Sequence, residues 1–150
     1  MDPPGSQHGQ IVAKAVSKTS KSVLFVCYAN QCRSPMAMIL FKDLVARSEE
    51  KLVEWRIESA GTDALTGYPA TKDAAFVISE MGLNLHDHRS QPITGSLLNG
   101  FNLILCMEND QIDTLKQSFP TAKKKSFSLK RNVRTGSRNM GSRRKSSICL

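Results

Sequence analysis

Apolar runs alternate with apolar residues at helical spacing between residues 21 and 117 of the chain. Continuous apolar or strand-forming character predicts three strands, at Lys21–Val26, Glu54–Ser59 and Asn102–Met107. Helical spacing predicts three helices, at Pro35–Ser48, Ala70–Met81 and Asp110–Gln117. Because strands and helices alternate, the sequence predicts an α/β fold with an open, mostly parallel sheet and helices on both faces.

Two of the helices carry enough apolar residues to predict their inward faces. The helix after Pro35 is expected to use a row of apolar side chains, namely Met36, Ile39, Leu40 and Leu44. The helix after Ala70 is expected to point four side chains inward, namely Ala74, Val77, Ile78 and Met81, and to end at Gly82.

The segment richest in chemistry is V-L-F-V-C-Y-A-N-Q-C-R-S-P, from Val23 to Pro35. Cys27 ends the first strand, Arg33 follows six residues later, and Pro35 opens the helix. A loop that joins a strand to a helix N-terminus directs backbone N–H groups and the positive end of the helix dipole at one spot. Such a cradle fits a phosphate-like dianion, which Arg33 can hold with a bidentate fork.

A thiol in this cradle is expected to ionise readily, so Cys27 is interpreted as a phosphate-attacking thiolate. Asn30 is expected in a left-handed conformation, which Asn tolerates better than most residues. The predicted phosphate-binding loop consists of Tyr28, Ala29, Asn30, Gln31, Cys32 and Arg33. The alternative is a buried cysteine beside an unrelated surface arginine, but the preceding strand, Asn30, Ser34 and Pro35 all favour the loop.

From about Lys21 to about Leu129 the chain resembles the low-molecular-weight protein-tyrosine phosphatases, especially the bacterial type. Besides the loop, three segments in the same order carry the resemblance: I-E-S-A-G-T-D-A-L-T-G-Y-P (Ile57–Pro69), G-L-N-L-H-D-H-R-S-Q-P-I-T (Gly82–Thr94) and F-N-L-I-L-C-M (Phe101–Met107). The resemblance implies a two-step hydrolysis of phosphotyrosine through a cysteinyl-phosphate, without a metal or an organic cofactor.

The resemblance also assigns roles to individual residues. It implies that Ser34 donates a hydrogen bond to the Cys27 thiolate and helps it leave in the second step. It places Ser59 and His88 in a surrounding layer that hydrogen-bonds Asn30 and Ser34, whereas His88 taken alone is more typical of a solvated loop histidine. It implies that Cys32 can form a reversible disulfide with the nucleophile, the alternative being that Cys32 only packs against the loop.

Composition limits the remaining possibilities. The 150 residues suffice for one domain. No apolar run approaches the roughly 18 residues of a membrane span, and residues 1–20 lack the apolar core of a secretion signal, so they are predicted to form a flexible extension. The four cysteines do not suggest a disulfide framework, and Cys106 is expected to be inert packing. A free nucleophilic thiol favours a reducing compartment, hence the cytoplasm.

Residues 121–150 break the pattern, because they hold ten of the 21 Lys and Arg residues and none of the 13 Asp and Glu residues. The core domain is therefore predicted to span 21–120, followed by a basic, disordered tail, with the last strand and helix of the family missing. A nucleic-acid-binding arm is poorly supported, since Phe127 is the single aromatic residue of the tail. The favoured interpretation is translation out of frame, because Asn139-Met140-Gly141 read one nucleotide forward must contain a tryptophan codon, and permitted codons then give Trp-Asp-Pro.

The tail matters because the family's general acid is an aspartate in an Asp-Pro loop, and no aspartate follows Asp113 here. The sequence therefore predicts a phosphatase that acts on phosphotyrosine proteins, such as a bacterial tyrosine kinase, with impaired proton donation. A catalytically weak phosphate-binding module is the first alternative, and a branch of the family acting on phosphoarginine stays open. A thiol-dependent arsenate reductase is a weaker alternative, because it relays oxidation through further cysteines and Cys106 is the one nearby.

Overall fold

The computed structural model describes residues 19–49 and 53–130, in which strands and helices alternate. The elements follow in the order β1 (Thr19–Cys27), α1 (Arg33–Arg47), β2 (Val53–Gly61), α2 (Lys72–Glu80), α3 (Gly95–Asn99), β3 (Leu103–Cys106), α4 (Asn109–Ser118), the 3-10 helix η1 (Pro120–Lys125) and β4 (Ser126–Ser128). The three strands and three helices predicted from the sequence correspond to β1, β2, β3, α1, α2 and α4. None of the helices in the described ranges is long and apolar enough to cross a bilayer.

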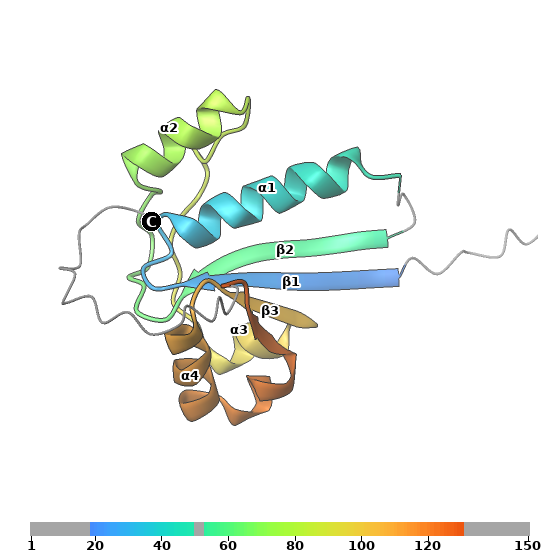
Figure 1. Ribbon diagram of the computed structural model, residues 1–150, viewed down its shortest axis with the longest axis vertical. Coiled ribbons are helices and arrows are strands. Elements are labelled where there is room, and N and C mark those ends of the chain that lie inside the picture. Colours follow the sequence, from blue (N-terminus) through green and yellow to red (C-terminus); the bar gives the residue numbers. More distant parts are fainter. Residues whose placement is uncertain (1–18, 50–52, 131–150) are drawn as a thin grey trace, which may run out of the picture.

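The four strands form one parallel sheet in the order β2-β1-β3-β4. In Figure 1, α1 and α2 lie on one side of the sheet and α3 and α4 on the other. The predicted open parallel sheet with helices on both faces is therefore confirmed. The chain leaves β1 toward β2 on one side and later returns to β3 on the other side, so the carboxyl end of β1 is the switch point where such sheets bind ligands.

Each face of the sheet has its own apolar core. Under α1, Phe25 of β1 contacts Phe41 edge-on with ring centroids 5.7 Å apart, and Phe41 contacts Trp55 at 5.2 Å. The opposite core lies under α3, α4 and η1 and is formed chiefly by Leu24, Val26, Leu98, Phe101, Ile104, Cys106 and Leu115. These two cores fix β1, and hence the loop that follows it.

The helix after the loop begins earlier than predicted, at Arg33 rather than Pro35. The N–H groups of the first helical turn have no acceptor within the helix. Pro35, which lacks an N–H, is therefore tolerated as the third helical residue just as it would be at the first. The first backbone bond of this turn runs from Met36 N to Cys32 O, at 3.1 Å. The loop therefore passes directly into the helix after Cys32.

Helix α2 is shorter than predicted, and its inward face is narrower. Ala74 and Ile78 are buried as expected, but Val77 and Met81 are about half exposed, so their predicted burial is wrong. The reason is that this nine-residue helix packs at the end of α1 and not over the sheet. At the end of α1, its neighbours cover only a narrow apolar strip of the helix. The predicted ending is confirmed, because Gly82 is left-handed at φ 75°.

The chain remains structured beyond residue 120, so the predicted domain boundary and the predicted absence of a further strand need correction. Strand β4 pairs in parallel with β3, and Leu129 N donates to Cys106 O at 2.8 Å. The Lys125 ammonium, expected to be part of a disordered basic run, instead donates to the carbonyls of Leu98 and Phe101 at 2.7 and 2.8 Å. The proposed frame change in residues 131–150 and the extension up to residue 18 lie outside the described residues.

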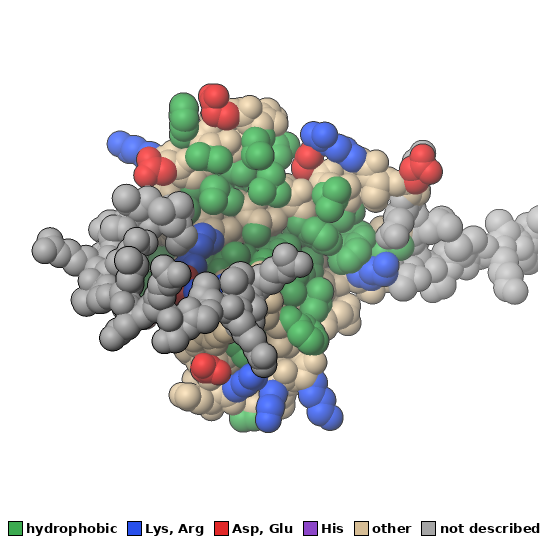
Figure 2. Space-filling model, in the orientation of Figure 1, with side chains coloured by type: hydrophobic (Ala, Val, Ile, Leu, Met, Phe, Trp, Pro, Cys, Tyr) green, Lys and Arg blue, Asp and Glu red, His purple; other side chains and the backbone are tan. Residues whose placement is uncertain are grey.

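Strand β4 has an unusual distribution of polar and apolar side chains. Ser126 is buried opposite Ile104, whereas Phe127, opposite Leu105, is 53% exposed. Phe127 faces the side of the sheet where α1 lies, but α1 packs over β1 and β2 and leaves β4 uncovered. Figure 2, in the orientation of Figure 1, shows hydrophobic side chains over α1.

Candidate active site

The loop from Cys27 to Arg33 curls around the Cys27 thiol at the carboxyl end of β1. Asn30 has φ 56°, the left-handed conformation expected from the sequence, and this turn brings its N–H to 3.2 Å from Cys27 Sγ. The six residues predicted to bind phosphate connect β1 to α1, and the last of them begins the helix: Tyr28, Ala29, Asn30, Gln31, Cys32 and Arg33. Cys27 is free and buried at the base of the loop.

Ser34 is oriented to donate a hydrogen bond to the Cys27 sulfur. The two atoms, Cys27 Sγ and Ser34 Oγ, lie 3.0 Å apart. The side-chain amide of Asn30 donates to Ser34 Oγ at 2.9 Å, which occupies an acceptor position of the hydroxyl. The remaining acceptor for the hydroxyl proton is the carbonyl of Ala60, at a longer 3.4 Å. The geometry therefore favours donation from Ser34 to sulfur, which stabilises a thiolate.

Asn30 connects the loop to two neighbouring segments. Its side-chain amide also donates to Ser59 Oγ at 2.9 Å, and its Oδ1 accepts from the backbone N–H of Gln91 at 2.9 Å. Its carbonyl lies 2.6 Å from His88 Nε2, and since a carbonyl can only accept, this nitrogen carries the proton. Ser59 and His88 thus both contact Asn30, while Gln91 is a partner that the sequence analysis missed.

The His88 ring is held in its neutral form. Burial lowers the pKa of His88, and the positive charges of Arg89 and Lys42 lower it further, against the opposing effect of the bond to Asn30. A neutral imidazole with its proton on Nε2 is a fixed donor, so it anchors the loop backbone.

Arg33 forms an ion pair with Glu108, a residue that the sequence analysis did not single out. Glu108 follows β3 and caps α4, where its backbone N–H donates to Gln111 Oε1 at 2.9 Å. Its position directly after β3 could have indicated this role, because the carboxyl ends of parallel strands meet at one edge of the sheet. The Glu108 carboxylate fixes the Arg33 guanidinium at the loop. A bound phosphate would share this guanidinium with Glu108.

The segment after β2 lies against the outer side of the loop. The phenol of Tyr28 donates to Asp63 at 2.5 Å, and this bond together with the charge of Asp63 raises the pKa of Tyr28. Gln31 donates from its side chain to Pro69 O at 3.2 Å. Leu65 of the same segment is well exposed. These residues are the candidates for contact with whatever group carries the phosphate.

Cys106 pairs with Val26 in the sheet and makes none of the contacts to the Cys27 sulfur described above. It is fully buried in β3, and burial raises the pKa of its thiol to about 12, with a smaller contribution from Asp110. Within residues 19–49 and 53–130, no three His, Cys, Asp or Glu side chains are grouped closely enough to hold a metal ion. The groups that contact the Cys27 sulfur are the Ser34 hydroxyl and the Asn30 backbone N–H, and Arg33 follows at the end of the loop.

The chain is similar to known phosphatases. A family model described as low molecular weight phosphotyrosine protein phosphatase matches residues 22–140. The probable low molecular weight protein-tyrosine-phosphatase EpsP of Ralstonia nicotianae is 38% identical over 100 residues, covering 67% of this chain and 64% of EpsP. The chain thus spans less than two thirds of the length of that relative.

Two further relatives differ in the activity that their names give. The protein-arginine-phosphatase of Bacillus subtilis is 35% identical over 115 residues, covering 77% of this chain and 73% of the relative. The crystal structure of the Erwinia amylovora tyrosine phosphatase AmsI superposes with a TM-score of 0.62 at 33% identity, covering 71% of this chain and 66% of the other.

Proposed function

Because this chain belongs to the low molecular weight protein-tyrosine phosphatase family, we propose that it hydrolyses phosphotyrosine in proteins through a cysteinyl-phosphate on Cys27. The observation that carries the proposal is the pair of contacts to Cys27 Sγ, from Ser34 Oγ at 3.0 Å and from Asn30 N at 3.2 Å, inside a loop closed by Arg33. Both donors stabilise negative charge on sulfur, and a thiolate is the form that attacks phosphorus.

In the first step the thiolate forms a bond to phosphorus, and the bond from phosphorus to the phenolic oxygen breaks. The backbone N–H groups from Tyr28 to Arg33 and the Arg33 guanidinium hold the three other oxygens of the phosphoryl group. In the second step water attacks phosphorus, the sulfur–phosphorus bond breaks, and inorganic phosphate leaves. Ser34 donates to the departing sulfur, which makes the thiolate a better leaving group.

The departing phenolate needs a proton in the first step, and no Asp or Glu follows Asp113 in the chain. A positioned general acid contributes roughly 10²–10⁴-fold to such a step. We therefore expect slow turnover of phosphotyrosine, and much less impairment with a good leaving group such as nitrophenolate.

The first experiment is hydrolysis of p-nitrophenyl phosphate, with Cys27→Ser as the control and circular dichroism to establish folding. Turnover that disappears in Cys27→Ser supports the proposal, and phosphorylated tyrosine and arginine peptides then show which linkage is cleaved. A folded chain that binds phosphate but releases none from p-nitrophenyl phosphate would instead be a phosphate-binding module. The missing acid favours that second function, whereas the Cys27–Ser34 contact favours the first.

Protein partners of this site would be phosphotyrosine proteins, including tyrosine-autophosphorylating kinases, in a reducing compartment such as the cytoplasm that keeps Cys27 free. Arsenate reduction finds no support at Cys106, because a fully buried thiol with a raised pKa is a poor relay for oxidation.

A further inference from the structure

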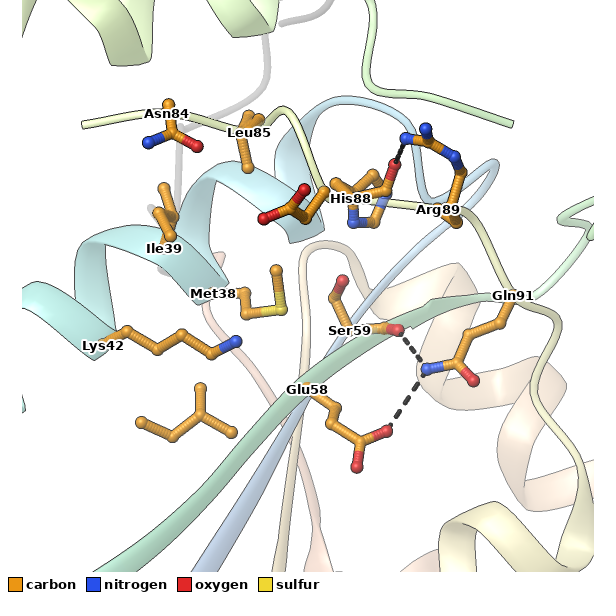
Figure 3. A pocket seen from close by; sticks show the side chains of 12 residues that line it. Met38, Ile39, Lys42, Glu58, Ser59, Asn84, Leu85, His88, Arg89 and Gln91 are labelled. Carbon is orange, nitrogen blue, oxygen red and sulfur yellow. Dashed lines mark hydrogen bonds between the residues drawn. The ribbon is translucent and has the colours of Figure 1, made fainter. Parts of the chain in front are cut away.

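A second concave site lies behind the loop, between α1, the edge strand β2 and the segment from residue 84 to residue 91 (Figure 3). Its volume is about 340 Å³, which is within the range of small-molecule pockets. It forms because β2 is the outermost strand of the sheet, so the 84–91 segment and α1 enclose the space beyond it. None of the residues that contact the Cys27 sulfur lines this pocket.

One wall of the pocket is apolar. The apolar side chains come from three elements, namely Met38 and Ile39 of α1, Ile57 of β2, and Leu85. An apolar wall in a concave site favours a ligand with an apolar body. When the two surfaces meet, the water that contacted each of them is released.

The charged groups at the pocket differ in whether they are already engaged. Glu58 accepts from Arg56 at 2.7 Å, and Arg89 donates to the carbonyls of His86 and His88. The Lys42 side chain reaches from α1 into the pocket, and within the described part of the chain its ammonium has no hydrogen bond or ion pair (Figure 3). Asp87 also lines the pocket, but no ion pair joins it to Lys42 among those residues. Lys42 and Asp87 are therefore the charges of this pocket that are not already engaged among those residues, and Lys42 is the one that attracts an anion.

Lys42 and Arg89 both line the pocket near His88, and their positive charges, after burial, lower the pKa of His88. An anion placed there gains attraction from both cations. His88 is also the side chain that holds the carbonyl of Asn30, so an occupant of this pocket would lie next to an anchor of the nucleophile loop.

We propose that this pocket binds a small organic anion, with its carboxylate on Lys42 and its apolar body against Met38, Ile39, Ile57 and Leu85. The proposal does not depend on the hydrolytic activity of the chain, because it concerns binding at a surface that the chemical step does not use.

The test uses 3-phenylpropionate as the probe and the full chain saturated with inorganic phosphate, so that the nucleophile loop is already occupied. We expect the probe to shift the backbone NMR signals of Ser59, Leu85 and His88. Lys42→Gln should weaken binding about tenfold or more, the usual consequence of losing a charge-assisted hydrogen bond. Lys116→Gln, which removes the same charge from α4 on the opposite face of the sheet, should leave the affinity unchanged.

Three results would overturn the proposal. If Lys42→Gln binds the probe as tightly as the unaltered chain, the ammonium does not hold the carboxylate. If phosphate abolishes binding, the probe occupies the nucleophile loop and not this pocket. The neutral analogue 3-phenylpropan-1-ol should bind as weakly as the acid binds to Lys42→Gln, and equal affinity of alcohol and acid for the unaltered chain would also contradict the proposal.

Discussion

The side-chain amide of Asn30 donates to the hydroxyl of Ser59 over 2.9 Å, and this bond joins the nucleophile loop to the carboxyl end of β2. Both residues are buried, so the bond is protected from competing water. The same amide orients Ser34, so the position of Ser59 bears on the hydroxyl that contacts the nucleophile.

Ser59→Ala should therefore lower the free energy of unfolding by about 1–2 kcal/mol, because one buried amide proton loses its acceptor. Urea unfolding measures this change, and phosphate affinity should fall in parallel. Ser79→Ala is a matched control, since Ser79 is exposed on α2 and its hydroxyl donates to Phe76 O of the same helix. An equal effect of the two substitutions would contradict the role assigned to Ser59.

Gly61→Ala adds only one methyl group but should lower both the free energy of unfolding and the affinity for phosphate. A Cβ at residue 61 would lie 2.9 Å from Asn30 N and 2.8 Å from Ala64 Cβ, distances that real Cβ atoms essentially never show. We expect a loss of about 2 kcal/mol or more and weaker phosphate binding, because backbone of the loop has to move. Gly95→Ala at the start of α3, where the nearest atom is 3.7 Å away, should cost far less in the same urea titration.

Glu108→Gln should tighten phosphate binding by about two- to tenfold, because a carboxylate beside Arg33 repels a bound dianion. Glutamine keeps a side-chain oxygen that can accept from Arg33, so the guanidinium stays in place. Isothermal titration with phosphate at two salt concentrations measures the effect, and the gain should shrink at high salt. Weaker binding in Glu108→Gln would show that positioning of Arg33 outweighs the repulsion.

The neutral state of His88 predicts a pH dependence of stability. Its pKa is lowered in the folded protein, so at pH values between the folded pKa and the unfolded value near 6.5 the unfolded chain binds more protons. The contribution of neutral His88 to the free energy of unfolding is fully present above the pKa of the unfolded chain. It is lost as the pH falls toward the pKa of the folded protein. Glutamine cannot titrate, so His88→Gln should lose less stability than the unaltered chain between pH 7.5 and 5.5. Thermal or urea unfolding measures this change. An equal change of stability with pH in the two proteins would contradict the role of His88.

Cys106 should resist alkylation in the folded protein. A thiol whose pKa is raised to about 12 has almost no thiolate at pH 8, and it is also inaccessible to reagent. Iodoacetamide followed by peptide mapping should leave Cys106 unmodified until urea is added. Modification of Cys106 at the same rate with and without urea would show that the β3 region opens readily.

The sequence predicted those parts of the site that depend on neighbouring residues. The strand before Cys27, the left-handed Asn30 and the glycine ending of α2 each follow from local preferences, and the structure has all three. Asp63, Gln91 and Glu108 were missed because their partners are more than 30 residues away, and only the assembled sheet edge brings them together.

The region after residue 120 shows a different limit of sequence reasoning. Its charge predicted a solvated tail, yet Lys125 has carbonyl partners and Ser126 donates to Ala122 O at 2.7 Å within the core. Net charge describes the average of a segment, whereas burial is decided residue by residue against a surface that β3 already provides.

Strand β4 has a consequence for how copies of this protein behave together. Among residues 19–49 and 53–130 no strand lies beyond β4, so its outer edge offers backbone groups for pairing, with the exposed Phe127 beside them. Natural proteins commonly protect such edges with charges, bulges or shortness, and β4 has only the last, at three residues. Strand pairing between copies at this edge would extend the sheet on the side farthest from β2.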